Sequence, residues 1–503
     1  MTSKAHQLPL IPERYVNAKS AETVSISNFV EPSGWNEQFP AYAHQLRGLL
    51  WMYFAEKGVL ADEVGLGKTI QTLLLVQFLK SRKQPHRTII VCGPRTVTQW
   101  RDEAKKFTNL SVAVAQGEKT WRISQYYQNW DILILSYPIL LRDISILASL
   151  YKDVVIYDEG SAFRHHEIKT KAAALELSKN TPRVIILDAT PIQNSLMDLH
   201  SLFEVLHLEN FPSKISFERS YVLRGAKDRR GFRPIVGYKN TSQLKSHVYP
   251  YILRRRSNEI TDEKTARGVT LPTVIPDRKI LELYPEQQKI YSDARTGLIE
   301  LWDKGLKHEV RAHFHHLLYA ADWTGYFPGD THNKSIKLDV IMDLLNNELS
   351  GEQVVIYSRY LGIIEELQRR LTRSNITYSR YTGKESIQQT DLAQKSFKSG
   401  ESRILLGTSS LERGLNLQNA RYLICIDQLL NPQRLTQLVG RIRRIGSKYD
   451  RVTVIMLLAD KTIEIKLDKA MSQRSAVSDF MLEEHNEIFE RLTDAELAEF
   501  IRD

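Results

Sequence analysis

The segment "VLADEVGLGKT" carries the residue types that bind a phosphate group. Gly65 and Gly67 allow backbone N–H groups to wrap an anion, and the helix predicted to begin just after them adds a partial positive charge. Lys68 would reach the outer phosphates of a nucleotide, and the hydroxyl of Thr69 would hold Mg²⁺. Asp62 stands where the strict phosphate-loop spacing has its first glycine, so the alternative is an ordinary glycine turn before a helix.

Two adjacent carboxylates end the apolar run "DVVIYDEGSAF". A buried parallel strand delivers such residues to the carboxyl edge of a sheet, where open α/β folds bind their ligands. A phosphate loop needs one acid to bind magnesium and a second to polarise water, and Asp158 and Glu159 fit these roles. Taken alone, the pair is more typical of a solvated loop, because acid pairs at strand ends are common.

The elements that must position these residues form two similar series. Short β-rich runs recur at "RTIIVCG", "WDILILSY", "DVVIYDE" and "RVIILDAT", with helix-compatible stretches such as "TIQTLLLVQFLKSR" between them. A second series follows at "QVVIYS", "SRILLGTS", "YLICID" and "VTVIMLLA", with amphipathic segments such as "LGIIEELQRRLTR". This alternation predicts an α/β fold of two lobes, each with a parallel sheet covered on both faces.

The expected divisions of the chain follow from these series. We expect an N-terminal extension over 1–35, a first lobe over 36–206, a second lobe over 331–470 and a helical C-terminal extension over 471–503. Residues 207–330 lose the alternation, which predicts a mostly helical insertion and a linker around "ARGVTLPTVIPDRK". Pro272 and Pro276 are expected to break regular structure there.

Bulk composition limits the class of protein. The 503 residues are 42% hydrophobic and 25% charged, which is typical of a globular chain with more than one domain. The net charge of +10 favours polyanionic partners without proving one. Cys92 and Cys425 lie in apolar runs and suggest neither a disulfide nor a zinc site. No signal core or membrane-length apolar run is evident, so we expect a soluble cytoplasmic protein, monomeric and without membrane partners, from a prokaryotic cell or a virus-infected host cell.

These motifs resemble those of superfamily 2 helicase-like ATPases, and specifically the SWI/SNF-type DNA translocases in a compact prokaryotic or viral branch. "DEVGLGKT" resembles motif I, "VCGPRTVTQWRDEAKKF" motif Ia, "DATPIQNSLMDLHSLF" motif III and "YILRRRSNEI" the distinctive link of the group. "VVIYSRY", "LLGTSSLERGLNLQNA" and "NPQRLTQLVGRIRRIG" resemble motifs IV, V and VI. The resemblance covers about residues 40 to 465 in the family's order.

The resemblance implies two RecA-like lobes, with ATP and Mg²⁺ bound between them and duplex DNA running across both. Gln45, in "YAHQLRGLLWMY", matches the adenine-recognition segment. Arg441 and Arg444 match motif VI and are implied to act on the γ-phosphate. Because they are three residues apart, they would share one face of a helix. As an isolated run, "GRIRRIG" could also be a basic solvated helix.

Several positions depart from the family's pattern. Ser161 replaces the histidine that usually ends motif II, which puts the coupling between the lobes in doubt. In motif V, small residues are replaced by Leu411, Glu412 and Arg413. Thr390 stands where many relatives carry arginine, and Ser447 replaces the last glutamine of motif VI. These departures indicate a divergent branch and not an inactive enzyme.

A basic stretch, "RGAKDRRGFRPIVGYK", is the candidate for contact with DNA phosphates. A solvated charged loop is the equal alternative. Histidines at 165, 166, 313, 315 and 316 lack a spacing typical of a metal site and are expected to be structural. The basic residues of the stretch are Arg224, Lys227, Arg229, Arg230, Arg233 and Lys239.

The expected function is an ATP-driven translocase on double-stranded DNA that remodels branched DNA, such as forks or junctions, in repair, replication or recombination. The alternative is displacement of DNA-bound proteins. An RNA helicase, or a clamp that binds ATP without hydrolysing it, is the more remote alternative.

Overall fold

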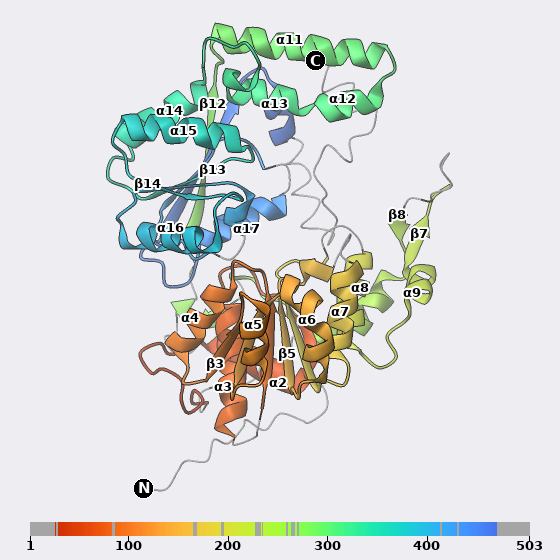
Figure 1. Cartoon of the computed structure of the whole chain (residues 1–503). Coiled ribbons are helices and arrows are strands. Elements are labelled where there is room, and N and C mark those ends of the chain that lie inside the picture. Colours follow the sequence, from red (N-terminus) through yellow and green to blue (C-terminus); the bar gives the residue numbers. More distant parts are fainter. Residues whose placement is uncertain are drawn as a thin grey trace. The chain divides into compact units, whose positions relative to one another are not determined.

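The computed structural model describes residues 26, 29–82, 86–163, 168–192, 196–226, 233, 235–257, 260–262, 267–268, 271–412, 415–429 and 432–469. The chain divides into two compact units, Met1–Thr270 and Leu271–Asp503. Each unit is built around its own parallel sheet (Figure 1). The predicted α/β fold with two parallel-sheet lobes is therefore confirmed.

The sheet of unit 1 has seven parallel strands in the order β3-β4-β2-β5-β6-β1-β9. The strands consist mainly of apolar residues because both faces of the sheet are covered. In β5, Val154 and Ile156 pack into one core cluster, while Val155 and Tyr157 pack into the other. The strands are β1 (Lys57–Leu60), β2 (Thr88–Cys92), β3 (Val112–Ala115), β4 (Ile132–Ser136), β5 (Val154–Asp158), β6 (Arg183–Leu187) and β9 (Ile252–Leu253).

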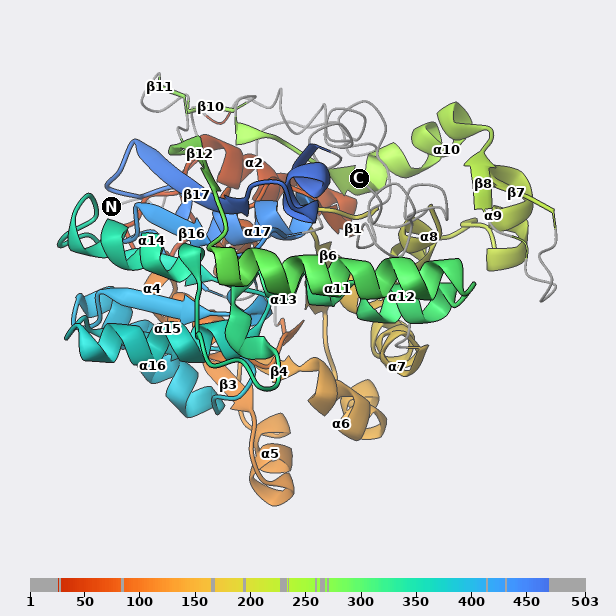
Figure 2. The same ribbon diagram turned by 90° about the horizontal axis from the view of Figure 1, so that it is seen from above.

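Helices cover the two faces of this sheet in separate groups. One core cluster takes residues from α2, α3 and α4, and the other takes residues from α6, α7 and α8. A small antiparallel hairpin, β7 (Val222–Arg224) and β8 (Ile235–Tyr238), follows α9 (Figure 2). The helices are α2 (Ala43–Ala55), α3 (Lys68–Ser81), α4 (Val97–Phe107), α5 (Lys119–Tyr126), α6 (Tyr137–Ser149), α7 (Ile168–Ser178), α8 (Leu196–Leu206), α9 (Lys214–Tyr221) and α10 (Thr241–Val248).

The sheet of unit 2 has six parallel strands in the order β12-β17-β16-β13-β15-β14. Helices α14 (Ile336–Asn346) and α15 (Leu361–Arg373) cover one face, and α16 (Ile387–Ser399) and α17 (Pro432–Ile442) cover the other (Figure 1). The strands are β12 (Thr273–Leu281), β13 (Val354–Tyr357), β14 (Tyr378–Tyr381), β15 (Ile404–Gly407), β16 (Tyr422–Cys425) and β17 (Arg451–Ala459).

The segment 207–330 differs from the single insertion that we expected, because both units share it. Strand β9 joins the sheet of unit 1, and β12 joins the sheet of unit 2. Pro276 does not break regular structure but lies inside β12, which is an edge strand and so tolerates a residue without an N–H donor. The α-helices that the segment contributes to unit 2 are α11 (Pro285–Asp303), α12 (Lys307–His313) and α13 (His315–Asp322), which pack together in one apolar cluster (Figure 2).

Most of the expected N-terminal extension and all of the C-terminal extension 471–503 lie outside the described residues. In the part of the chain that the structure describes, no helix is both long and apolar enough to cross a membrane.

Candidate active site

The loop between β1 and α3 has the backbone of an anion cradle. Gly67 caps the 14-residue helix α3 in a left-handed conformation, with φ 78° and ψ 46°, and Gly65 has φ 98°. Side chains disfavour these conformations, so the two glycines are required by the backbone. The first N–H groups of α3 have no partner within the helix and point towards the loop, where an anion would be stabilised.

Lys68 and Thr69 are the first two residues of α3, as predicted. The Nζ of Lys68 donates to the carbonyl oxygen of Asp62 at 2.6 Å, so its ammonium group lies over the loop itself. A phosphate in the cradle would therefore meet the lysine charge, the helix N-terminus and the glycine N–H groups together.

The start of α2 packs against the same loop. A Cβ atom on Gly67 would lie 2.6 Å from the Nε2 of Gln45, and the Nε2 of His44 lies 2.9 Å from the carbonyl oxygen of Leu66. Gln45 is buried and accepts a hydrogen bond from the backbone N–H of Tyr42 at 3.1 Å. The structure thus brings Gln45 to the phosphate loop, together with His44, for which the sequence indicates no role.

Asp62 forms a buried ion pair that no pattern in the sequence indicates. Arg255 donates from Nε to Oδ1 at 3.0 Å and from Nη2 to Oδ2 at 2.6 Å, and the two side chains are 2% and 0% exposed. Burial raises the pKa of Asp62, but the charge and hydrogen bonds of Arg255 outweigh it and hold that pKa below its ordinary value. Gln71 of α3 joins the pair by donating to Asp62 at 2.9 Å. The aspartate in the glycine's place therefore ties the loop to the "LRRR" segment after β9.

Asp158 and Glu159 lie at the carboxyl end of β5, with only β6 between β5 and β1. Adjacent strands are about 5 Å apart, so the strand of the acids and the strand of the phosphate loop are about 10 Å apart on one edge. The indole Nε1 of Trp100, on α4, donates to Oδ2 of Asp158 at 2.8 Å. Tyr137 donates its hydroxyl to the carbonyl oxygen of Asp158 at 2.9 Å. The acids thus sit beside the cradle, and Trp100 orients the first of them.

Glu159 has a backbone conformation that L-residues rarely adopt, with φ 61°. Such conformations cost energy and persist only where neighbouring structure enforces them. The backbone at the next residue, Gly160, packs tightly against its neighbours. A Cβ there would lie 2.6 Å from Ile186 of β6 and 2.8 Å from Leu202 of α8. Close packing after β5 therefore turns the chain sharply at Glu159.

The motif VI arginines differ from their predicted arrangement. Helix α17 ends at Ile442, so Arg441 lies in its last turn, whereas Arg444 lies beyond it and the two do not share a helix face. Arg441 is 9% exposed and donates from Nε and Nη2 to the carbonyl oxygen of Glu412, at 2.9 Å and 2.5 Å. Arg444 is half-buried. The two arginines therefore have different surroundings.

The basic stretch is only partly described. Arg224, Arg233 and Lys239 are exposed on or beside the β7–β8 hairpin. Arg224 is not a lone charge, because it pairs with Glu218 at 3.0 Å and donates to the carbonyl oxygen of Arg233 at 2.9 Å. Lys227, Arg229 and Arg230 lie outside the described residues.

The positions that depart from the family's pattern have local structural roles. Ser161 lies in the short helix η1 (Gly160–Phe163), and Ser447 donates to the carbonyl oxygen of Gln418 at 3.3 Å. Thr390 is buried in α16, where its hydroxyl donates to the carbonyl oxygen of Ile387 at 2.8 Å. Arg413 lies outside the described residues.

The cysteines and histidines of the described residues form no metal site. Both cysteines are buried free thiols. His165 and His166 lie outside the described residues, and within the described ranges no group of three His, Cys, Asp or Glu side chains could hold a metal ion. His313, His315 and His316 pack against aromatic rings around Tyr319.

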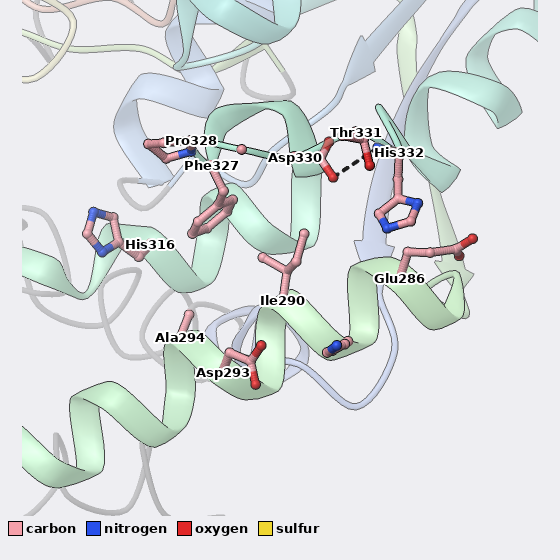
Figure 3. Close-up of a pocket in the computed structure, with 12 residues that line it drawn as sticks. Glu286, Ile290, Asp293, Ala294, His316, Phe327, Pro328, Asp330, Thr331 and His332 are labelled. Atoms are coloured by element: carbon pink, nitrogen blue, oxygen red, sulfur yellow. Dashed lines mark hydrogen bonds between the residues drawn. The ribbon is translucent and has the colours of Figure 1, made fainter.

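A separate pocket of about 470 Å³ lies in unit 2 (Figure 3). Glu286, Ile290 and Asp293 of α11 line one side, and the loop from Phe327 to His332 lines the other. Asp330 accepts the backbone N–H of His332 at 3.1 Å, which stabilises that loop. None of the predicted site residues lines this pocket.

Comparison with known proteins now identifies the family. The model of the SNF2-related domain matches residues 44–372, and the model of the helicase conserved C-terminal domain matches residues 336–446. The chain belongs to the SNF2-related family. The SNF2-related match begins at the residue before Gln45 and includes the phosphate loop and both acids of β5.

Relatives of this SNF2-related chain occur in plants and bacteria. It is 28% identical to the probable ATP-dependent DNA helicase CHR23 of Arabidopsis thaliana, over 85% of this chain and 42% of that protein. It is 26% identical to the putative ATP-dependent helicase/translocase YwqA of Bacillus subtilis, over 90% of this chain and 50% of that protein. The chain thus spans half or less of the length of these relatives. A solved structure, the Sulfolobus solfataricus SWI2/SNF2 ATPase core in complex with dsDNA, is 24% identical with a TM-score of 0.43, covering 94% of this chain and 99% of that one.

Proposed function

We propose that this SNF2-related chain hydrolyses ATP and uses the energy to move along double-stranded DNA. The observation that carries the proposal is the meeting of the phosphate loop after β1 with Asp158 and Glu159 after β5 on one edge of the sheet. A cradle for phosphates beside two adjacent acids is what phosphoryl transfer to water requires. The names of the relatives CHR23 and YwqA, both given as ATP-dependent helicases, support this proposal.

The residues of the site fit a nucleotide and a magnesium ion. The left-handed glycines and the N-terminus of α3 can bind a chain of phosphates. Hydroxyl and carboxylate oxygens are ligands that Mg²⁺ prefers. Thr69 and Asp158 would hold the ion, which neutralises charge on the phosphates. Glu159 would polarise the attacking water, Lys68 would contact the outer phosphates, and Gln45 would contact the adenine.

Of the two motif VI arginines, we expect Arg444 to supply more of the charge in the transition state. Arg444 is half-buried, and its Nε donates one long hydrogen bond to the carbonyl oxygen of Gly440, at 3.4 Å. Arg441 is buried and makes two shorter hydrogen bonds to the carbonyl oxygen of Glu412. An arginine that stabilises the transition state is worth about 10³ to 10⁵ in rate. We therefore assign the larger catalytic share to Arg444.

Hydrolysis assays test the proposal directly. ATP turnover is measured without nucleic acid and with single-stranded DNA, duplex DNA, forked DNA and RNA. We expect stimulation by duplex and forked DNA, and loss of turnover in Lys68→Ala with DNA binding retained, because this lysine serves the nucleotide. Stimulation by RNA alone would make the chain an RNA helicase, and ATP binding without turnover would make it a clamp.

The finer part of the proposal is that branched DNA is the substrate. Phosphate contacts carry no base information, and the exposed residues Arg224, Arg233 and Lys239 offer contacts of that kind. At a fork or junction, each base pair broken ahead of a motor can be replaced by a new pair behind it. Affinity should fall with salt, with a slope of about 0.9 per neutralised phosphate on a log–log plot.

Equal amounts of blunt duplex, fork and four-way junction with ATP separate this idea from its alternative. Branch migration predicts strand products from forks or junctions and none from blunt duplex. Equal stimulation by all three DNAs without strand products, together with displacement of a bound protein, would indicate a remodeller of DNA-bound proteins.

A further inference from the structure

Glu412 has an unusual set of contacts for a residue that replaces a small one in motif V. It ends the short helix η5 (Ser409–Glu412), which follows β15, and it is only 4% exposed. Its Oε1 accepts the hydroxyl of Tyr357 at 3.0 Å, and its Oε2 accepts the Nε of Arg434 at 2.7 Å. Its carbonyl oxygen accepts two hydrogen bonds from Arg441. One residue therefore contacts the end of β13 and two positions of α17.

The two arginines lie at opposite ends of α17 but on one side of it. Arg434 is in the first turn and Arg441 is in the last. Residues seven apart are separated by about two helical turns, or about 10 Å along the axis, and differ in direction by only about 20°. Leu438, between them, packs in the same apolar cluster as Leu411 of η5. The side of α17 that carries Arg434 and Arg441 thus contacts η5.

The contacts of Glu412 compensate the energetic cost of burying its carboxylate. A buried carboxylate is costly unless charged and hydrogen-bonded partners compensate it, and Arg434 and Tyr357 do so here. Burial, followed by the charge of Glu412, raises the pKa of Tyr357, so its hydroxyl keeps the proton that it donates. The double contact of the Arg441 guanidinium with one carbonyl fixes the direction of that side chain.

We propose that Glu412 is a positioning residue that holds α17, and the motif VI segment after it, in the orientation that ATP hydrolysis requires. The carboxylate sets the start of the helix through Arg434, and the carbonyl sets its end through Arg441, two residues before the segment that carries Arg444. This inference rests on the proposed ATPase function. It also gives the Glu412 departure from the family's pattern a physical purpose.

The central test compares Glu412→Gln with Arg434→Gln and the double variant. Each single change removes one charge of the pair. Glu412→Gln keeps the size of the side chain, whereas Arg434→Gln also shortens it. We expect kcat for DNA-stimulated hydrolysis to fall, by up to about 100-fold, because small displacements of positioned groups have effects of that size. The KM for ATP should change little. The double variant should be no slower than the slower single variant, because both changes break the same contact.

A matched control and a second measurement distinguish a local effect on α17 from a general loss of folding. Glu348→Gln removes the same charge from an exposed position of unit 2 and should behave as wild type. Hydrogen exchange of the full chain should show faster exchange of the α17 amides in Glu412→Gln, with the sheet strands β13 and β15 still protected. Uniformly faster exchange throughout unit 2 would point to a merely structural role and overturn the inference.

The outcomes separate the two proposals. If the wild-type chain shows no ATP turnover with any DNA, the proposed function fails, and the exchange measurement alone then decides whether Glu412 holds α17. If the wild-type chain turns over ATP but Glu412→Gln keeps its kcat, the inference about Glu412 is overturned while the proposed function stands.

Discussion

The two acids at the end of β5 are oriented in different ways. Trp100 donates to the carboxylate of Asp158, whereas Glu159 is directed by a left-handed backbone conformation that close packing at Gly160 enforces. Neither the hydrogen bond from Trp100 nor the backbone conformation of Glu159 adds a charge to the site. Single substitutions can therefore separate the role of each acid from the stability of unit 1.

Glu159→Gln should bind ATP but hydrolyse it very slowly. The amide cannot polarise water as the carboxylate does, whereas the proposed magnesium ligands Thr69 and Asp158 are unchanged. Nucleotide affinity and single-turnover hydrolysis measured on the same sample check this expectation. Glu209→Gln, at an exposed position of unit 1, is the control. A large loss of ATP affinity in Glu159→Gln would contradict the division of roles.

Trp100→Phe should raise the Mg²⁺ concentration needed for half-maximal turnover. Phenylalanine keeps the aromatic packing but lacks the N–H that orients Asp158, and loss of such a partner typically costs about 10- to 100-fold in metal affinity or activity. Titration of turnover with Mg²⁺ measures the effect. Trp130→Phe removes a comparable buried indole bond, to the carbonyl oxygen of Tyr126, away from the site. An equal effect in both variants would show that the loss is structural.

At the scale of elements, ion pairs tie loops to strands that are distant in sequence. Asp62, in the phosphate loop, and Arg255, after β9, form such a pair, with Gln71 of α3 alongside. Because β9 pairs with β1, the end of unit 1 and its phosphate loop form one structural block. The loop's conformation thus depends on the segment that leads towards unit 2.

Arg255→Gln should destabilise unit 1 strongly. Breaking one partner of a buried ion pair costs about 3–5 kcal/mol, because a carboxylate is left buried without its counter-charge. The melting temperature should fall on the order of 10 °C. Arg101→Gln, in an exposed pair with Asp102, should change it little. The double variant Asp62→Asn with Arg255→Gln should recover part of the loss, and no recovery would contradict the assignment to this pair.

At the scale of the whole molecule, the two units each contain a buried acid next to a basic side chain, but the pKa values of these two acids shift in opposite directions. In unit 1, Arg122 is the partner of Asp143 at 2.5 Å; burial raises the pKa of this acid, but the arginine and Tyr126 lower it further than burial raises it. In unit 2, Lys337 lies between Asp322 and Glu464, at 2.7 Å and 2.6 Å, and all three side chains are fully buried. Burial, with the charges of Asp427 and Glu464, raises the pKa of Asp322 well above its ordinary value despite Lys337.

Asp322→Asn should therefore change how stability depends on pH. An acid whose folded pKa is raised stays protonated in the folded state while the unfolded chain releases its proton, so the wild-type chain loses stability as pH rises from about 4 through the raised pKa. Asparagine carries no proton to release, so the variant should gain melting temperature relative to wild type between about pH 5 and pH 8. Calorimetry of both full chains across this range checks the sign. A gap that is constant with pH would exclude Asp322 as the cause.

Much of the fold follows from the sequence, because its signals are local. Apolar runs of strand length alternate with amphipathic segments, and each predicted run became a strand of one of the two sheets. Gly65, Gly67, Lys68 and Thr69 are contiguous, so their spacing already determines that they meet at the start of α3. The local signal failed where context decides, as at Pro276, because an edge strand accepts a proline that a central strand would not.

The partners of the site residues were decided only by the tertiary structure. Asp62 and Arg255 are 193 residues apart, and Trp100 and Asp158 are 58 apart, so no local pattern connects them. The helix end at Ile442 separates the surroundings of Arg441 and Arg444, although their spacing suggested a shared face. In the sequence Glu412 is only a departure from a motif, whereas in the folded chain it contacts Arg434 and Arg441 of α17. Sequence spacing determines which residues enter one element, whereas the packing of elements determines which side chains can exchange hydrogen bonds and charge.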